Sequence, residues 1–389
     1  MGNSAAKDNV FMKIVKYLIP WKGDKIGEII RKIVFLTALI VLIVTGVLFL
    51  KANAESRQNI ENDKVLSEAF HGTGTGLQID TSKKEELQQQ NPGMLENFLP
   101  FFTDDGVTNS RGHKVEPHDI RGWLLINGYG DEKPLVDNIV MQFTDNDYYL
   151  YHNSYGESVR SGTLYVDYRV DMENGQNPGN IVVYAHNMLD APGEIDYFGV
   201  LLQYFNYAKK NYGSDGKLHQ NDIEDPNSKI HDISFYQHHP VIEFSTLYDN
   251  STYKIFGGIM VNTNSYAGEV FNYHRVHSFA NKDEFDNFCA EILDRSCFIN
   301  PDVDLRYGDE LLTLSTCIYG YGSTANTRFV IFARKTRDGE SPEVDVEKAY
   351  ANPSPKFYDT FYQIFDYKWE GRKWPTEMIW AFGKKEQDS

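Results

Sequence analysis

An uninterrupted apolar run, Ile33–Leu50, constrains this 389-residue chain more than any other stretch, because it contains no charged residue. Its length lies at the lower end of what spans a bilayer, and Ala52 extends it. The rival interpretation is a cleaved signal peptide. However, the run is long, begins more than thirty residues into the chain and lacks a convincing small-residue cleavage site. We therefore expect an uncleaved transmembrane anchor over residues 33–50.

Basic residues flank this run unequally, which predicts its orientation. Those that precede it are Lys7, Lys13, Lys16, Lys22, Lys25, Arg31 and Lys32. Those that follow closely are Lys51, Arg57 and Lys64. Cytoplasmic flanks are enriched in Lys and Arg, so we expect a single-pass protein of the cell membrane. Residues 1–32 would be a cytoplasmic segment, and everything after the anchor would be extracellular.

The remaining chain divides into three parts by composition. Residues 51–117 are polar and include a helix-like run at 83–90, so we expect an extracellular stalk with N-terminal helices. Residues 118–335 are expected to form one catalytic domain, with the polar segment 209–232 as a surface loop. Residues 336–389 form an aromatic-rich C-terminal extension. Its stripe of Phe357, Phe361, Ile364 and Phe365 predicts a helix that docks on the domain.

Within residues 118–335 the pattern is mainly β. Short runs rich in Val, Ile, Tyr and Phe alternate with turn residues, as is typical of a closed barrel. The expected strands lie at 164–169, 180–186, 240–247, 252–261, 311–316 and 328–335. A helix is predicted at 282–295, where Phe285, Phe288, Ile292 and Leu293 share one face.

The net charge and the cysteine content limit the functions that the chain can have. The formal net charge of −17 disfavours nucleic-acid binding. Three cysteines cannot all pair within one chain. Cys289 and Cys297 are about 12 Å apart along a helix, too far for a disulfide, so we assign both to the core. No metal-ligand or cofactor-binding pattern is present: His238 and His239 are adjacent and would diverge on a strand.

Cys317 ends one predicted strand and Arg328 begins the next, with a polar Gly/Ser/Thr/Asn loop between them. A strand-end thiol is held rigidly yet reaches solvent, and a nearby guanidinium favours the thiolate and holds an oxyanion. Most free cysteines are instead buried hydrophobic residues. The spacing alone leaves both interpretations open.

Longer motifs favour the catalytic interpretation. They are RGWLLING at 121–128, DNDYYLYHN at 145–153, SGTLYVDYR at 161–169, NIVVYAHNM at 180–188 and GDELLTLSTC at 308–317. Together they resemble the sortases, cysteine transpeptidases of Gram-positive surfaces, and class B most closely. The resemblance implies a closed eight-stranded β-barrel with N-terminal helices, and a helix at 282–295 before the nucleophile strand.

The resemblance also implies roles for particular residues. Cys317 would be the nucleophile, His186 the general acid and base, and Arg328 the group that holds the oxyanion. The residues that match the lining of the peptide groove are Asn146, Leu150 and Ser315. The chain departs from the class in the loop from Cys317 to Arg328, which is one residue longer than is common, and at two positions. Asn187 stands where a second His is common, and Ile318 where an acidic residue is common.

The implied function is a membrane-anchored transpeptidase that cleaves the sorting signal of a secreted protein after Thr. It would form a thioester on Cys317 and transfer the acyl group to an amine of a peptidoglycan precursor or a pilin. Class B enzymes commonly recognise an NPxTx-type motif. The alternatives are a surface cysteine hydrolase that uses the same site and a non-enzymatic adhesion module.

Overall fold

The computed structural model describes residues 12–74, 79–130, 133–172, 179–191, 194–205, 233–318, 326–365 and 368–379. The chain divides into two compact units, Met1–Gln58 and Asn59–Ser389. The predicted loop 209–232, most of the loop that follows Cys317, and the last ten residues lie outside the described residues.

Helix α2 (Ile26–His71) contains the apolar run predicted as a membrane anchor. It is longer than the run itself, so the anchor and the start of the predicted stalk are one continuous helix. Among the described residues, α2 is the one helix long and apolar enough over an 18-residue stretch to cross a membrane.

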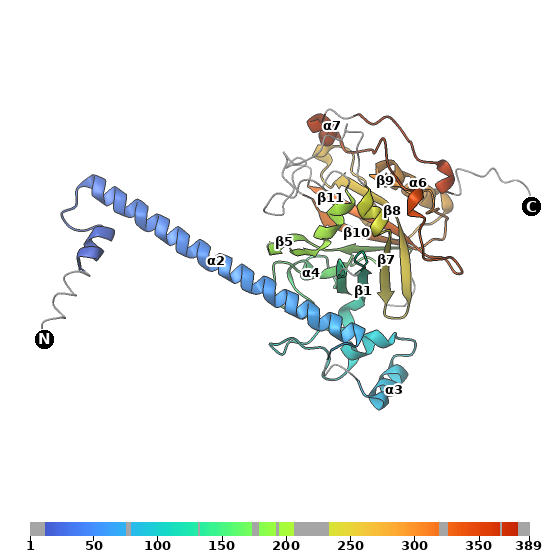
Figure 1. Cartoon of the computed structure of the whole chain (residues 1–389), viewed down its shortest axis with the longest axis horizontal. Helices are drawn as coiled ribbons and strands as arrows, with labels where there is room; N and C mark the ends of the chain where they lie inside the picture. The colour runs from blue at the N-terminus through green and yellow to red at the C-terminus, as the bar shows by residue number, and fades with distance from the viewer. Residues whose placement is uncertain are drawn as a thin grey trace, which may run out of the picture. The chain divides into compact units, whose positions relative to one another are not determined.

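A closed β-barrel forms the centre of the second unit, as the sequence predicts (Figure 1). Its strands are β1 (Ile120–Ile126), β2 (Val136–Met141), β3 (Leu164–Val166), β4 (Asn180–Tyr184), β7 (Val241–Thr246), β8 (Asn250–Asn262), β10 (Leu311–Cys317) and β11 (Thr327–Lys335). They follow the order β1-β2-β3-β4-β10-β11-β8-β7. Most neighbours are antiparallel, but β4 runs parallel to β10 and β2 runs parallel to β3.

Side-chain alternation along the strands separates the barrel interior from its outer face. The interior holds a continuous apolar cluster that includes Leu124, Val140, Leu164, Val183, Leu314 and Ile331. The outer face is covered on two sides. One side packs against α6 (Lys282–Arg295) and the other against the N-terminal helices.

Helix α6 has the bounds that the sequence predicts. It begins at a cap in which the Asn281 side chain accepts a hydrogen bond from the Glu284 amide, which satisfies one of the free N–H groups of the first turn. Two glycines in β8 allow close packing, Gly257 against α6 and Gly258 against β9 (Phe298–Ile299). A Cβ on Gly257 would lie 2.7 Å from Ile292, and one on Gly258 would lie 2.8 Å from Phe298.

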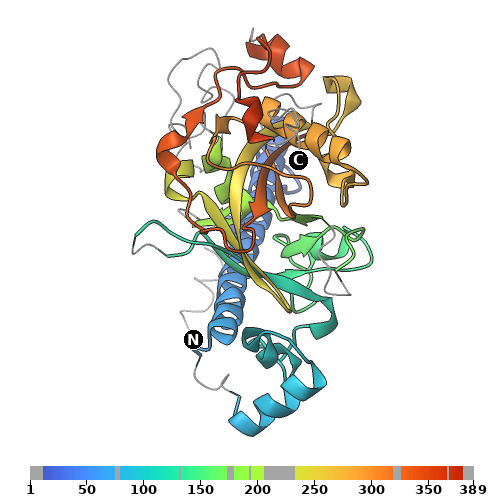
Figure 2. The same cartoon turned by 90° about the vertical axis from the view of Figure 1, so that its right-hand side faces the viewer.

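The region predicted as a stalk packs on the barrel. It contains α3 (Thr81–Gln90) and the 3-10 helix Glu96–Phe102. Phe70 stacks on Trp123 with ring centroids 4.3 Å apart, and the Trp123 indole donates to Asp137 at 2.7 Å. In Figure 2 these helices (cyan) lie at one end of the unit, while α6 (orange) and the C-terminal extension (red) lie at the other.

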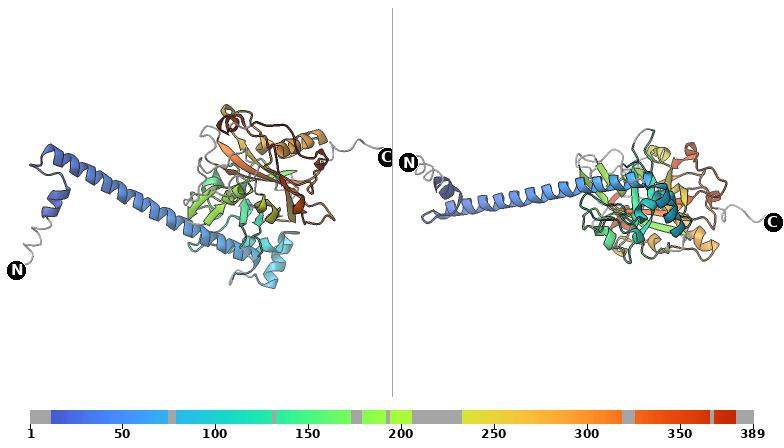
Figure 3. Two further views of the ribbon diagram at one scale, coloured as in Figure 1. Left: turned by 45° about the horizontal axis from the view of Figure 1, so that its top comes forward. Right: turned by 90° about the horizontal axis from the view of Figure 1, so that it is seen from below.

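The C-terminal extension docks on the domain, and the left view of Figure 3 shows its dark red segments around the part of the unit that holds the gold helix α6. It contains β12 (Tyr350–Ala351), which pairs with β9 (Phe298–Ile299), and α7 (Asp359–Phe365). Phe357 and Phe361 are buried as predicted, but Ile364 is exposed. Ile364 lies within α7, on the part of the helix that faces solvent.

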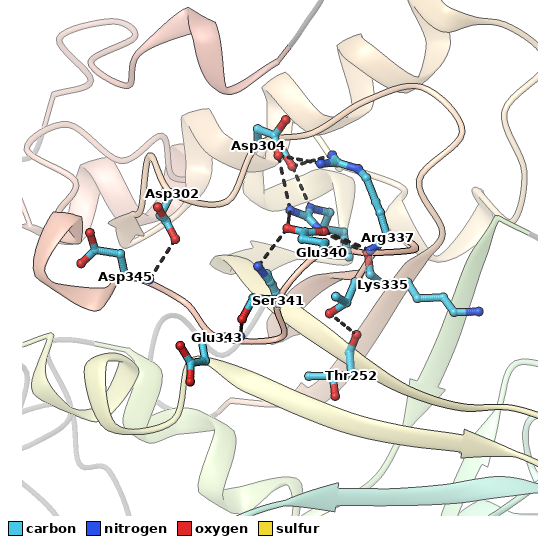
Figure 4. A network of polar contacts seen from close by, with 12 residues as sticks. Thr252, Asp302, Asp304, Lys335, Arg337, Glu340, Ser341, Glu343 and Asp345 are labelled. Carbon is cyan, nitrogen blue, oxygen red and sulfur yellow. Dashed lines mark hydrogen bonds and ion pairs between the residues drawn. The ribbon is translucent and has the colours of Figure 1, made fainter.

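An ionic network lies at the far end of β11, about 20 Å from Arg328 at the usual rise of a strand. Arg334 is fully buried and pairs with Asp304 and Glu340. Arg337 pairs with Asp304 and Asp309. Figure 4 shows Asp304, Arg337 and Glu340 converging.

Strands β1, β9 and β12 lie outside the expected ranges, and so do three strands of mixed polar and apolar composition. Strand β2 pairs with β1, and β5 (Asn187–Ala191) pairs with β6 (Glu194–Tyr197) beside the barrel. Their sequences mix acidic and amide residues with apolar ones, so their intrinsic preference for a strand is weak. Hydrogen bonds to the neighbouring strands therefore stabilise them as strands. Two further short α-helices are α4 (Tyr148–Tyr151) and α5 (Ser234–His238).

Candidate active site

Strand register brings the three predicted catalytic residues to one rim of the barrel. Cys317 ends β10 and lies directly opposite Arg328 on β11. In the parallel pair, Ser315 lies opposite Tyr184, so the chain after β4 reaches the level of Cys317 at His186. The Ala185 carbonyl accepts from Thr316 Oγ1 at 2.9 Å, which keeps the two segments together beyond the strand end.

These residues lie on the outer face of the barrel wall. On β10, Cys317 alternates in the same direction as Ser315, whereas Leu314 points into the interior. Tyr165 and Tyr184 occupy the same outer surface, with ring centroids 5.5 Å apart. The site is therefore formed by polar and aromatic side chains on the outer surface of the barrel, separate from the apolar core.

A backbone carbonyl orients His186. Its Nε2 lies 2.9 Å from the carbonyl oxygen of Leu150 in α4. A carbonyl only accepts, so Nε2 carries the proton and Nδ1 of the neutral ring is left as a proton acceptor. In the part of the chain that the structure describes, this contact takes the place of the carboxylate that often orients a catalytic histidine.

The Arg328 guanidinium is held at one edge. Its Nη1 donates to Asn326 Oδ1 at 3.0 Å and to the Thr327 carbonyl at 3.0 Å. Asn326 has φ of 48°, a left-handed conformation that Asn tolerates better than most residues. Nη1 is therefore occupied, and within the described residues Nε and Nη2 have no hydrogen-bond partner.

The three cysteines differ in the way the sequence predicts. All are free; Cys289 and Cys297 are buried, and Cys317 is partly exposed. Burial raises the pKa of both buried thiols well above the usual range, so they remain protonated near neutral pH. Cys317 is the thiol that a substrate can reach.

Asn146 is engaged in a polar cluster below the site. Its amide donates to Asp167 at 3.1 Å, and its Oδ1 accepts from the Tyr168 amide at 3.0 Å. Burial would raise the pKa of Asp167, but hydrogen bonds from Arg169 outweigh it and hold that pKa below its usual range. Asp167 is therefore an anion that fixes the loop, and contact between Asn146 and a substrate stays a prediction.

Ser315 is buried on β10, two residues before Cys317. Its hydroxyl lies 2.7 Å from the hydroxyl of Tyr273. Burial raises the pKa of Tyr273 to about 12, so this phenol is protonated at neutral pH and is not a general base. Leu150 is partly buried against the N-terminal cluster, so its side chain also stays a predicted groove residue.

Three contacts of the site were not predicted. They are the Leu150 carbonyl on His186, the Asn326 side chain on Arg328, and a hydrogen bond of 3.0 Å from Asn187 Nδ2 to the Cys317 carbonyl. The last ties the histidine segment to the nucleophile. In the sequence, Asn187 is marked only as a position where class B members commonly have a second His. Among the described residues, no group of three His, Cys, Asp or Glu side chains is placed to hold a metal ion.

Comparison with known proteins gives two related sequences. The chain is 24% identical to sortase B of Staphylococcus aureus over 302 residues, which cover 78% of this chain and 95% of that protein. It is also 24% identical to sortase B of Listeria monocytogenes over 257 residues, which cover 64% of this chain and 84% of that protein. No family model matches the chain.

Solved structures give similar results. One is a Staphylococcus aureus sortase B–substrate complex, with 22% identity, a TM-score of 0.48, and coverage of 73% of this chain and 99% of that chain. Another is Clostridium perfringens sortase B, with 26% identity, a TM-score of 0.41, and coverage of 57% and 95%.

Both sequence matches extend over most of a class B sortase, and the closed barrel with its N-terminal helices and α6 agrees with them. The chain is therefore similar in sequence to class B sortases, which are cysteine transpeptidases, over most of their length.

Proposed function

We propose that this protein is a membrane-anchored sortase that cleaves the sorting signal of secreted proteins after Thr and joins the new carboxyl end to an amine. The observation that supports it most is the register of β4, β10 and β11, which places His186, Cys317 and Arg328 at one rim. The apolar segment of α2 would hold the enzyme at the membrane, with the barrel outside the cell.

In the first half-reaction, His186 Nδ1 takes the proton of the Cys317 thiol as sulfur attacks the scissile carbonyl carbon. The tetrahedral oxyanion would be held by Nε and Nη2 of Arg328, the edge that Asn326 leaves open. When the C–N bond breaks, the leaving amine takes the proton from Nδ1. The product that stays on the enzyme is a thioester.

In the second half-reaction, an acceptor amine loses a proton to His186 Nδ1 and attacks the thioester. The Cys317 sulfur leaves and recovers its proton, and an amide bond forms. The acceptor would be an amine of a peptidoglycan precursor or of a pilin. If water took its place, the same residues would make the protein a surface hydrolase.

The test uses the full chain in detergent micelles with peptides of the NPxTx type. Without an amine we expect slow hydrolysis, and with peptidoglycan-type or lysine-type amines we expect mainly amide-linked product by mass spectrometry. The amine should also raise turnover, because it removes a slowly hydrolysed acyl-enzyme. If hydrolysis dominated at saturating amine, the surface hydrolase would replace the transpeptidase.

A further inference from the structure

Each of the four backbone carbonyls of the short helix α4 receives a hydrogen-bond donor from a side chain or from a segment outside the helix. Three of these donors are local: His152 Nδ1 to Tyr148, the Thr163 amide to Tyr149, and the Val159 amide to Tyr151, at 2.8, 3.0 and 2.9 Å. The fourth is His186 Nε2, which binds the Leu150 carbonyl. The local contacts therefore set where the Leu150 carbonyl points.

Gly162 packs directly against these carbonyls. A Cβ at this position would lie 2.4 Å from the Tyr149 oxygen and 2.6 Å from the Leu150 oxygen. Real Cβ atoms essentially never approach other atoms within 3.0 Å, so a side chain here would displace the backbone of α4. Gly162 also has φ of 61°, a region that glycine enters without penalty.

We propose that Gly162 is a positioning residue for proton transfer by His186. Its bare α-carbon lets the turn at 161–163 close on α4, so that the Leu150 carbonyl meets Nε2 and keeps the proton there. Nδ1 is then available for the Cys317 thiol. A methyl group at 162 would push the carbonyl away and release the imidazole from this tautomer and orientation. This inference rests on the proposed role of His186.

The test compares Gly162→Ala with Gly156→Ala in the full chain. Gly156 is a matched control because it has φ of 72° in the same loop region, while its added Cβ would meet only the Tyr148 hydroxyl at 3.4 Å. Both substitutions place an alanine at a positive φ and so strain the backbone. Only Gly162→Ala displaces the Leu150 carbonyl. We expect Gly162→Ala to lower kcat about 10- to 100-fold with KM nearly unchanged, and Gly156→Ala to stay within about twofold of wild type.

A second measurement needs no substrate. Iodoacetamide should alkylate Cys317 more slowly in Gly162→Ala than in Gly156→Ala, because the misplaced imidazole accepts the thiol proton less well. His186→Asn sets the lower limit. If His186→Asn left alkylation and cleavage unchanged, the proposed role of His186 would fail. If His186→Asn were slow but Gly162→Ala matched its control, only the role of Gly162 would be overturned.

If Gly162→Ala does not fold, the carbonyl can be weakened without touching Gly162. The α-hydroxy analogue of tyrosine at position 151 converts the Leu150 carbonyl into an ester, which is a poorer hydrogen-bond acceptor. We expect kcat to fall about fivefold or more at unchanged melting temperature. An ester variant with the kcat and alkylation rate of wild type would contradict the proposal.

Discussion

The proposed role of Arg328 depends on the shape of its side chain as well as on its charge. One edge of the guanidinium is bound to Asn326 and the Thr327 carbonyl, and the other edge is left to meet a substrate. A Lys side chain offers a single ammonium, so it cannot bind Asn326 and an oxyanion through two separate edges.

We therefore expect Arg328→Lys to lower kcat by about 10²-fold, as loss of an oxyanion donor does in other enzymes. Steady-state cleavage of an NPxTx-type peptide measures it. Arg306→Lys is the control, because Arg306 is an exposed residue that binds Asp304 at the other end of the barrel. A lysine variant at 328 with near wild-type turnover would assign the oxyanion to another residue.

The cysteines separate catalysis from stability. Cys317→Ala replaces a partly exposed thiol at a strand end, so we expect no cleavage and an unchanged melting temperature. Cys289→Ala removes a sulfur that α6 contributes to the core, so we expect normal cleavage and a loss of about 1–2 kcal/mol in the free energy of unfolding. Cleavage assays and denaturant titrations test both. Turnover by Cys317→Ala would exclude the thioester mechanism.

At the scale of elements, the charge network at the end of β11 holds together strands and loops that diverge beyond the barrel. Glu340 accepts from the buried Arg334 and from Lys254. Burial would raise the pKa of Glu340, but these hydrogen bonds outweigh it and hold that pKa well below the usual range. Ionised Glu340 therefore stabilises the folded state.

Glu340→Gln should lower the free energy of unfolding by about 2 kcal/mol near pH 7, since Arg334 keeps Asp304 as a partner. The contribution of Glu340 is present above the unfolded pKa, near 4.5, and is lost as pH falls through the lower folded value. The difference from wild type should therefore shrink below about pH 4.5.

Denaturant titrations at several pH values measure this effect. Glu343→Gln is the control: it removes the same charge from an exposed side chain of the same segment and should change little. A difference for Glu340→Gln that stayed constant down to pH 3 would contradict the ionic explanation.

On the scale of the whole molecule, the membrane anchor and its orientation form one prediction. The apolar part of α2 follows a basic flank, so the N-terminus should stay in the cytoplasm. Protease added to intact cells should then digest the chain only after Lys51. A tag at the N-terminus should remain protected until the cells are permeabilised. A barrel protected from protease in intact cells would reverse the topology.

Local sequence predicted much of this protein. The apolar run, the strands at the nucleophile and the bounds of α6 follow from periodicity and caps that act over a few residues. The motifs around Cys317 and His186 are also local patterns of a few residues, and they indicated the resemblance to the family. Strand β2 was missed because its polar residues give a weak local preference, and pairing with β1 stabilises it.

The contacts that set the chemistry lie between distant segments. His186 meets the carbonyl of Leu150, 36 residues earlier, and Asn187 meets the carbonyl of Cys317, 130 residues later. Every non-proline residue has the same carbonyl, so no residue type or spacing marks which one a side chain will find. Barrel closure and strand register bring these groups together, and they do so through long-range pairing that a local pattern does not encode.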